Sequence, residues 1–324
     1  MAKYALCLDY GTAPCRGLVA GLLVCCCAVA FAADAKKDGR MVLVPAGVLR
    51  GVDPDFGGIC LTNSKAFLMD KTEVTESLWM DVFDHFNALD AKEEFIYFRS
   101  EGWTWTFDGP EKGDNYPVAG VSFRNALLWC NARSKQEGLT PCYLNEKKSE
   151  YQGIHDEPIW CDFEATGYRL PTSQEWEYAA RGGECTRFPW GDTICFTNAN
   201  YTGDKQANYD LSGGGLHPVF SKRVAVKVFE QATSPVMSFP PNTYGLYDMT
   251  GNVAEWCWPD NTSELKFTRY TWFILRGGSW RSEPQKLRTG NKDAMPEDDC
   301  YHGRMIFWKL LSSGFRCVRK APDS

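Results

Sequence analysis

Gly245-Leu-Tyr-Asp-Met-Thr-Gly-Asn-Val-Ala-Glu-Trp256 is the stretch that decides the fold. It places glycines, an asparagine and acids between large aromatic groups, which predicts tightly turned backbone with exposed oxygens. Asp248 and Glu255 supply carboxylates on either side of Gly251-Asn252. Calcium takes about six to eight oxygens of this kind. The residues equally fit an aromatic-rich turn that packs into a core with both acids solvated.

The stretch resembles a motif of the formylglycine-generating enzyme (sulfatase-modifying factor) family, whose members have a C-type-lectin-like fold. Further segments match that family's motifs in the same order, and so many ordered matches make a chance resemblance improbable. The matching segments are Met41-Val-Leu-Val-Pro-Ala-Gly47, Val74-Thr75, Pro117-Val118, Val121-Ser122, Gly167-Tyr-Arg-Leu-Pro-Thr172, Glu175-Trp-Glu-Tyr-Ala-Ala-Arg-Gly182, Pro189-Trp-Gly-Asp192, Thr197-Asn-Ala-Asn200, Leu275-Arg-Gly-Gly-Ser-Trp280 and Gly314-Phe-Arg-Cys317. The resemblance implies an irregular α+β fold with small twisted antiparallel sheets, two main helices and much loop.

The matches run without a break, so we expect a single domain over residues 41–320. The whole chain of 324 residues carries 35 basic and 41 acidic side chains, a net charge of -6. This balance gives no electrostatic reason to expect nucleic acid as a partner. We expect a monomer.

Residues 1–32 have the pattern of a secretory or lipoprotein leader, and residues 33–40 that of a polar tether. An apolar run over residues 17–31 follows Arg16, is too short to span a membrane, and ends in Ala30-Phe31-Ala32. Cleavage after Ala32 would release a soluble protein. Acylation of one of Cys25 to Cys27 would instead anchor it, so the membrane is a partner only through a lipid. We favour the anchored form, a bacterial cell-surface lipoprotein with an extracytoplasmic domain.

Local patterns predict strands over residues 41–48 and 67–73, the second leading into a helix over 75–86. A helix over residues 122–138 can be capped by Ser122 and ended by Gly138. In a third helix, over residues 172–181, Thr172 and Glu175 have the spacing of a capping box. Residues 182–238 are rich in glycine and asparagine and predict loops.

The chain has 14 cysteines, many for a reduced cytosolic protein. The family resemblance implies a disulfide between Cys130 and Cys317. Spacing alone leaves two further pairs open, Cys185 with Cys195 and Cys142 with Cys161.

Enzymes of the resembled family hold copper with two cysteines that follow Gly-Gly-Ser, and thiolates suit Cu(I). Here residues 277–299 contain no cysteine, and Ser282 stands where the first thiol would be. The four histidines, His85, His155, His217 and His302, are widely scattered. We therefore expect no copper, no catalytic residue and no enzymatic activity.

The family's calcium sites are matched in part. The resemblance implies one structural calcium held by Asp248 and Glu255 and by the backbone at Gly251 and Val253. Asn200-Tyr201 resembles half of a second site. The other half should lie just before Thr233-Ser-Pro-Val236, where the family has an acid, and the chain reads Lys227-Val-Phe-Glu230 there. This departure from the family pattern leaves the second site doubtful.

Large aromatic and charged groups crowd the C-terminal segment, residues 270–313, with little periodicity, a composition typical of recognition surfaces. The layout resembles the variable ligand-binding proteins of this family that retroelements diversify, such as the treponemal variable lipoprotein. We expect a macromolecular ligand, a protein or another polymer. The predicted ligand-binding residues are Trp272, Trp280, Arg281, Ser282, Glu283, Asn291, Asp293, Tyr301, His302, Arg304 and Trp308.

Three alternatives to a binding role at this segment stay open. The residues can merely complete a sheet. The chain can be a metal-dependent oxidase or protein-modifying enzyme with a rebuilt centre. It can also be a structural component of the cell envelope that contacts a partner subunit.

Overall fold

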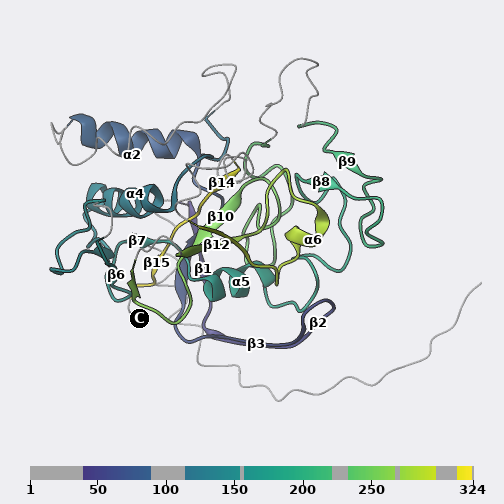
Figure 1. The fold of residues 1–324 in the computed structure, drawn as a ribbon, viewed down its shortest axis with the longest axis horizontal. Helices are drawn as coiled ribbons and strands as arrows, with labels where there is room; N and C mark the ends of the chain where they lie inside the picture. Colours follow the sequence, from purple (N-terminus) through teal and green to yellow (C-terminus); the bar gives the residue numbers. More distant parts are fainter. Residues whose placement is uncertain are drawn as a thin grey trace, which may run out of the picture.

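The computed structural model describes residues 39–88, 114–153, 157–220, 233–266, 271–296 and 312–322. Its small antiparallel sheets, few helices and long loops confirm the predicted α+β class (Figure 1). The predicted leader and nearly all of the tether lie outside these ranges. Across the described ranges no helix is both long and apolar enough to span a membrane.

The first sheet joins the two ends of the domain. Its order is β1 (Met41–Val44), β4 (Phe67–Asp70), β15 (Val318–Lys320) and β7 (Tyr168–Arg169), with every neighbouring pair antiparallel. The predicted strand over 41–48 is interrupted at Pro45-Ala46 and continues as β2. Proline has no N–H for a sheet ladder, which explains the interruption.

Two helices pack against each other on one side of the core (Figure 1). They are α2 (Glu76–Ala88) and α4 (Phe123–Gln136). Ser122 caps α4 as predicted, its hydroxyl accepting the N–H of Asn125 at 3.2 Å. Residues 123–134 are buried on every side of the helix, more than its sequence pattern indicates. Trp129 of α4 stacks on Trp79 of α2 with ring centroids 5.8 Å apart, so aromatic packing joins the helices.

The helix α5 (Ser173–Arg181) begins and ends where the sequence predicts. Thr172 and Glu175 form the capping box, and Gly182 ends the helix in the left-handed conformation with φ 58°. Its Trp176 is fully buried, as expected for a core residue.

The second sheet carries the stretch around Gly251. Its order is β13 (Asp293–Pro296), β12 (Trp272–Arg276), β10 (Ala254–Cys257) and β14 (Ser313–Gly314). The β10 and β14 strands are parallel, and the other two pairs antiparallel. The short helix α6 (Pro284–Leu287) lies between β12 and β13. The described part of the segment over residues 270–313, predicted to have little periodicity, therefore contains β12, the helical turn α6, β13 and the first residue of β14.

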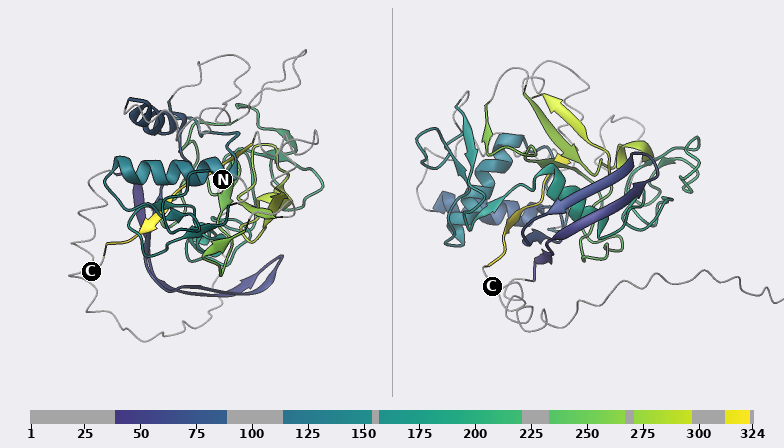
Figure 2. Two further views of the ribbon diagram at one scale, coloured as in Figure 1. Left: turned by 60° about the vertical axis from the view of Figure 1, so that its left-hand side comes forward. Right: turned by 90° about the horizontal axis from the view of Figure 1, so that it is seen from below.

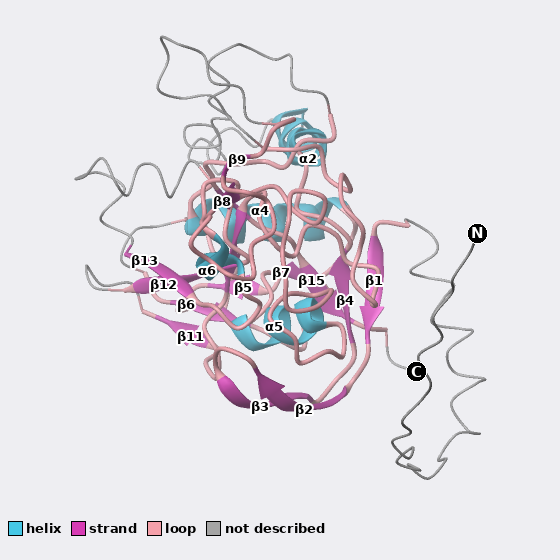
Figure 3. Cartoon of the chain, turned by 90° about the vertical axis from the view of Figure 1, so that its right-hand side faces the viewer, coloured by secondary structure: helices cyan, strands magenta, loops and turns pink. Residues whose placement is uncertain are grey.

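Three smaller sheets complete the structure. One has the order β11 (Glu264–Leu265), β6 (Ile159–Cys161) and β5 (Tyr143–Leu144), and another pairs β8 (Thr202–Gly203) with β9 (Gly215–Leu216). The third is a long hairpin of β2 (Gly47–Asp53) and β3 (Gly57–Asn63). The hairpin runs under α5 (Figures 2 and 3). We did not predict it, although burial alternates along both strands and Gly57-Gly58 supplies a turn signal.

Candidate functional site

A hollow of about 320 Å³ opens where β10, β12, β13, β14 and α6 meet. Five predicted ligand-binding residues line it, namely Arg281, Ser282, Glu283, Asn291 and Asp293. The other lining residues are Ala254, Leu275, Gly278, Ser279, Lys286, Ser312 and Ser313. The structure thus gathers much of the predicted surface around one concave site, which we call the pocket.

Not every predicted residue belongs to the pocket. Trp272 is 59% exposed but does not line it, and Trp280 is half-buried beside it. The backbone N–H of Trp280 donates to the Asn252 carbonyl at 2.9 Å, which ties the loop to the turn at Gly251. Four further predicted residues lie outside the described residues: Tyr301, His302, Arg304 and Trp308.

The sequence did not predict that Ala254, Ser312 and Ser313 line the pocket. Ala254 begins β10, and Ser312 and Ser313 lie at β14, which pairs with β10 in parallel. Ser312-Ser313 directly precede the Gly-Phe-Arg-Cys motif, and this adjacency is the signal that could have identified them. Ser279 was also missed, although it belongs to the Gly-Gly-Ser-Trp motif.

A tight turn at Gly277-Gly278 forms the wall of the pocket that carries Ser279 and Ser282, which we call the near wall. Gly277 and Gly278 have φ of 78° and 66°, a conformation that glycine adopts without strain. The backbone N–H of Ser279 donates to the Ser282 hydroxyl at 2.9 Å, and the Ser282 N–H donates to the Ser279 carbonyl at 2.8 Å. Ser282, at the position of the family's first thiol, therefore helps to close the turn and also lines the pocket.

Arg276 supports the pocket through hydrogen bonds to the backbone of residues 289–291. Its guanidinium is buried and donates to the Asn291 carbonyl at 2.7 Å and to the Thr289 carbonyl at 3.3 Å. It also donates to Glu177 on α5 at 2.6 Å, so the charge is paired. A buried arginine that bonds backbone in this way fixes the segment between α6 and β13.

The pocket is polar and carries both signs of charge. Arg281 and Lys286 are cationic, Glu283 and Asp293 are anionic, and several hydroxyl groups and the Asn291 amide complete it. Partial burial of the Arg281 guanidinium lowers its pKa. None of the described lining residues is a cysteine or a histidine. The lining is suited to binding a ligand with several polar groups.

Glu255, a predicted calcium ligand, is fully buried in an ion pair. One of its carboxylate oxygens accepts from Arg316 Nη2 at 2.8 Å. The other accepts from Arg316 Nε and from Trp176 Nε1, both at 2.8 Å. The expectation that both acids of the stretch can be solvated is wrong for Glu255, because Arg316 from the Gly-Phe-Arg-Cys motif reaches it inside the core.

Asp248 is also buried but less completely paired. Its Oδ2 accepts the N–H of Met237 at 2.8 Å, whereas its buried Oδ1 has no hydrogen-bond partner. Burial, with a smaller contribution from the charge of Glu255, raises the pKa of Asp248 to about 6. The residue has φ 55°, the left-handed conformation, as expected in a sharp turn.

Glu73, which precedes α2, is the member of this cluster that sequence reasoning missed. Its carboxylate accepts the Val253 N–H at 3.0 Å and the Asn252 side-chain amide at 2.7 Å. Burial and then the charges of Asp248 and Glu255 raise the pKa of Glu73 well above its usual range. Three carboxylates thus share the positive charge of Arg316, and their full ionisation would leave excess negative charge in the core.

The predicted calcium ligands fit the ion in part. Asp248 Oδ1 is a buried carboxylate oxygen available to a cation, and the excess negative charge favours one. Against this, both oxygens of Glu255 already accept hydrogen bonds. In the part of the chain that the structure describes, no group of three or more His, Cys, Asp or Glu side chains is arranged to hold a metal. A calcium ion would therefore depend on backbone oxygens at Gly251 and Val253 as well. Residues 227–230, relevant to the second site, lie outside the described residues.

The eight cysteines of the described ranges all have free thiols. Cys130 and Cys317 are buried with their sulfurs 3.6 Å apart, so the structure places this pair together, and the disulfide stays a prediction. Cys161 ends β6 and Cys142 directly precedes β5, where Cys161 is opposite Tyr143 rather than opposite Cys142. Adjacent strand residues point to opposite faces, which disfavours that pair.

Cys185 and Cys195 have separate surroundings. Cys185 packs against Gly51 of the hairpin, where an added Cβ would lie 2.2 Å from its sulfur. Cys195 lies by the side chains of Thr197 and Asn198. The structure gives no support to a bond between these two cysteines.

Comparison with known proteins decides the family. A family model described as "Sulfatase-modifying factor enzyme 1-like domain" matches residues 28–321. The chain belongs to this family. It is 31% identical over 278 residues to the chaperone protein LppX of Paenibacillus barcinonensis. The aligned residues cover 82% of this chain and 85% of that protein. It is 39% identical over 233 residues to the formylglycine-generating enzyme of Mus musculus, 69% of this chain and 46% of the mouse protein.

A solved structure confirms the fold of this chain. Treponema denticola variable protein 1 superposes with a TM-score of 0.58 at 24% sequence identity. The superposition covers 87% of this chain and 95% of that protein. At this identity the likeness concerns the fold alone.

Proposed function

We propose that this protein is a non-enzymatic, extracytoplasmic binding protein that holds a polypeptide ligand, or another macromolecule with similar polar groups, at the pocket. The observation that carries this proposal is the pocket's lining. Arg281, Glu283, Asn291 and Asp293 offer charges of both signs and an amide within one concave site. Polypeptides present backbone donors and acceptors together with side chains of either charge, so such a lining complements them.

The described lining of the pocket contains no thiol, which supports a binding role over catalysis. Family enzymes require two cysteines after Gly-Gly-Ser to hold copper, and Ser282 occupies the first of these positions. A serine hydroxyl is a poor ligand for Cu(I) compared with a thiolate. Ser282 moreover accepts a hydrogen bond that closes the turn.

Two further features of the proposal come from relatives. LppX bears the name chaperone, which supports a polypeptide as the class of ligand. The likeness of residues 270–313 to retroelement-diversified regions supports a binding surface whose amino-acid sequence differs between copies of the gene. A reverse transcriptase gene beside a near-copy of this 3′ end would support that feature. We also propose that residues 1–32 direct the domain out of the cytoplasm and leave it attached through a lipid.

The resident metal that we propose is one calcium ion near Asp248. The Asp248 and Glu255 carboxylates and the backbone oxygens of Gly251 and Val253 would hold it. Calcium would neutralise the excess charge of the buried carboxylate cluster and stiffen the turn that supports Trp280. Its role would be structural, because Glu73, Asp248 and Glu255 are not among the described lining residues of the pocket.

A runner-up function is an oxidase or protein-modifying enzyme, favoured by the 39% identity to the mouse enzyme. It requires a metal centre rebuilt without the thiol pair. Copper bound at a stoichiometric level, together with oxidation of a cysteine-containing peptide, would establish this alternative.

Selection from a displayed library of random 12-residue peptides tests the binding proposal. Peptides selected on the full-length protein are synthesised, and their affinities are measured for wild type, Arg281→Ala and Asn291→Ala. We expect each substitution to weaken binding about tenfold, a typical effect of losing a contact at a recognition site. Arg50→Ala, which truncates an exposed arginine on the hairpin, is the matched control. Equal affinities for all four proteins would rule the pocket out.

A further inference from the structure

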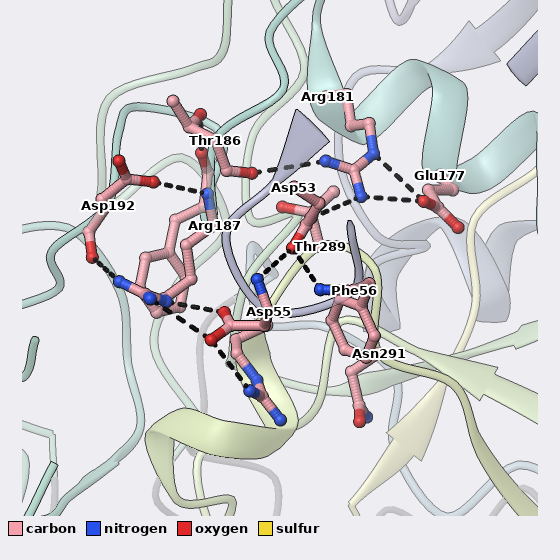
Figure 4. Close-up of polar contacts among 12 residues, drawn as sticks. Asp53, Asp55, Phe56, Glu177, Arg181, Thr186, Arg187, Asp192, Thr289 and Asn291 are labelled. Atoms are coloured by element: carbon pink, nitrogen blue, oxygen red, sulfur yellow. Dashed lines mark hydrogen bonds and ion pairs between the residues drawn. The ribbon is translucent and has the colours of Figure 1, made fainter. Parts of the chain in front are cut away.

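The tip of the β2–β3 hairpin, residues 53–57, lies against the chain segment 284–291, which supplies one wall of the pocket (Figure 4). Asp53 shapes the tip, because its Oδ1 accepts the N–H groups of Asp55 at 2.9 Å and Phe56 at 3.1 Å. These bonds fold Asp53 to Phe56 into a compact turn that presents Asp55 and Phe56.

Asp55 joins the tip to two arginines. Its carboxylate accepts from Arg187 Nε at 2.6 Å and Nη2 at 3.2 Å, and pairs with Arg288 Nη1 at 3.3 Å. Burial works to raise the pKa of Asp55, but the hydrogen bonds and charges of Arg187 and Arg288 outweigh it and lower the pKa. Arg288 in turn donates to the Gln285 carbonyl at 2.8 Å. The Asp55 contact therefore reaches the backbone of the pocket wall.

Apolar contacts at the tip reinforce the ionic ones. A Cβ added to Gly290 would lie 2.6 Å from Cδ2 of Phe56, so the ring packs directly on that backbone. The Arg288 guanidinium lies 5.1 Å from the Phe56 ring centroid. Phe56 is 46% exposed, and the covered part of its ring faces the pocket wall.

A second chain of ion pairs runs from the tip through α5 to the same wall. Asp53 pairs with Arg181 at 2.8 Å, and Arg181 pairs with Glu177 at 2.9 Å. Glu177 pairs with Arg276 at 2.6 Å. Arg276 donates to the carbonyls of Thr289 and Asn291. Both routes end on residues 285–291, a segment that includes the lining residues Lys286 and Asn291.

We propose that the hairpin tip is a positioning element for the pocket: Asp55 and Phe56 hold the wall that carries Lys286 and Asn291 in its binding geometry. The inference rests on the proposed binding function. A two-stranded hairpin is marginally stable alone, so its tip contacts stabilise the hairpin and the wall together. A wall that is already ordered loses less entropy when ligand binds, which raises affinity.

Hydrogen exchange and peptide affinity, measured on the same variants, test the proposal. Asp55→Asn removes the charge that pairs with two arginines, and Phe56→Ala removes the ring on Gly290. Asp55→Glu and Phe56→Tyr are the conservative variants. Glu164→Gln is the matched control, because it also changes an acid to an amide and breaks an ion pair, with Lys65, away from the pocket.

We expect exchange of the amides of residues 285–291 to quicken about tenfold in Asp55→Asn and Phe56→Ala, since local opening becomes easier. Affinity for the selected peptide should fall about fivefold, with normal thermal unfolding of the rest of the protein. The conservative variants should restore both measurements toward wild type, and Glu164→Gln should change neither.

Unchanged exchange in Asp55→Asn and Phe56→Ala would overturn the positioning role. Quicker exchange with unchanged affinity would overturn it too, because the wall would then move without affecting recognition. If wild type selects no peptide that depends on Arg281, the proposed function fails instead, and exchange of residues 285–291 alone decides whether the tip holds the wall.

Discussion

At the scale of single residues, the stretch around Gly251 is organised by charge in the core. Glu255 pairs with Arg316 from the Gly-Phe-Arg-Cys motif, 61 positions away, and Glu73 bonds Val253 from 180 positions away. The acids at Asp248 and Glu255 could be found in the sequence because they belong to one motif. Their partners could not, since long-range ion pairs leave no local spacing pattern. Only the family resemblance marked the Gly-Phe-Arg-Cys motif.

Replacing Arg316 by methionine should destabilise the protein by about 3–5 kcal/mol, because it leaves buried Glu255 without its counter-charge. Urea denaturation at neutral pH measures the loss. Lys65→Met removes an exposed ion pair with Glu164 and should leave the unfolding midpoint unchanged. A loss in Arg316→Met no larger than in this control would contradict the assignment of Arg316 as the charge that holds the turn.

Calcium should stabilise wild type against thermal unfolding, and Asp248→Ala should remove the effect. At a calcium concentration about a hundredfold above Kd, a single site contributes about 2.7 kcal/mol to the free energy of unfolding. Differential scanning fluorimetry with calcium and with a chelator measures this difference. Equal melting temperatures in the two conditions would show that the carboxylate cluster is neutralised by protons rather than by calcium.

At the scale of elements, local signals predicted the helices well and the hairpin badly. The Thr172–Glu175 capping box is a short-range pattern, so α5 could be placed to within a residue. The β2–β3 hairpin depends on contacts of its tip with Arg187 and Arg288, far along the chain. Apolar and polar residues do not alternate along β2, where Val48 and Val52 are exposed and Leu49 is half-buried, and glycines weaken the strand pattern further.

The Glu175 carboxylate makes the stability of α5 depend on pH. Burial opposes its ionisation, but the charge and hydrogen bonds of Arg169, at 2.6 and 2.8 Å, outweigh burial and lower its pKa. In the unfolded chain the pKa returns to about 4.3. The unfolded chain therefore binds more protons between the two values, and stability rises with pH across that window. The contribution is complete above the unfolded value and is lost as pH falls through the folded one.

Glu175→Gln should accordingly lower the free energy of unfolding at neutral pH by about 1.5–3 kcal/mol, because glutamine keeps the capping-box acceptor but removes the charge that pairs with buried Arg169. The difference between variant and wild type should shrink when urea denaturation is repeated below about pH 4. Glu184→Gln, an exposed change just beyond the helix, is the control. A difference that stays constant with pH would show that the charge of Glu175 is not what stabilises α5.

At the scale of the whole molecule, elements distant in sequence converge to build both the core and the pocket. β14 pairs with β10 and supplies a pocket wall that motif spacing did not reveal. The near wall was predictable, because the Gly-Gly-Ser-Trp motif and the unusual composition after it are continuous in the chain. The order of the motifs identified the family, while the position of Ser312 beside Ala254 required the folded structure.

Oxidation should join Cys130 of α4 to Cys317 beside β15, whose sulfurs are 3.6 Å apart. The bond would close a long loop and contribute up to about 4 kcal/mol by restricting the unfolded chain. Non-reducing peptide mapping identifies the pair, and denaturation with and without reductant measures its contribution. Cys317→Ala should abolish the dependence on reductant. A mature protein isolated with both thiols free would contradict the predicted disulfide.

The most direct test of a binding role for the pocket is a crystal structure of the protein with a selected peptide. We predict that the peptide lies in the hollow between Arg281, Asn291 and Ser313, chemically unchanged, with its polar groups bonded to these residues. A peptide bound on another face while the hollow stays open, or one whose cysteine has been oxidised at a metal in the hollow, would contradict the account.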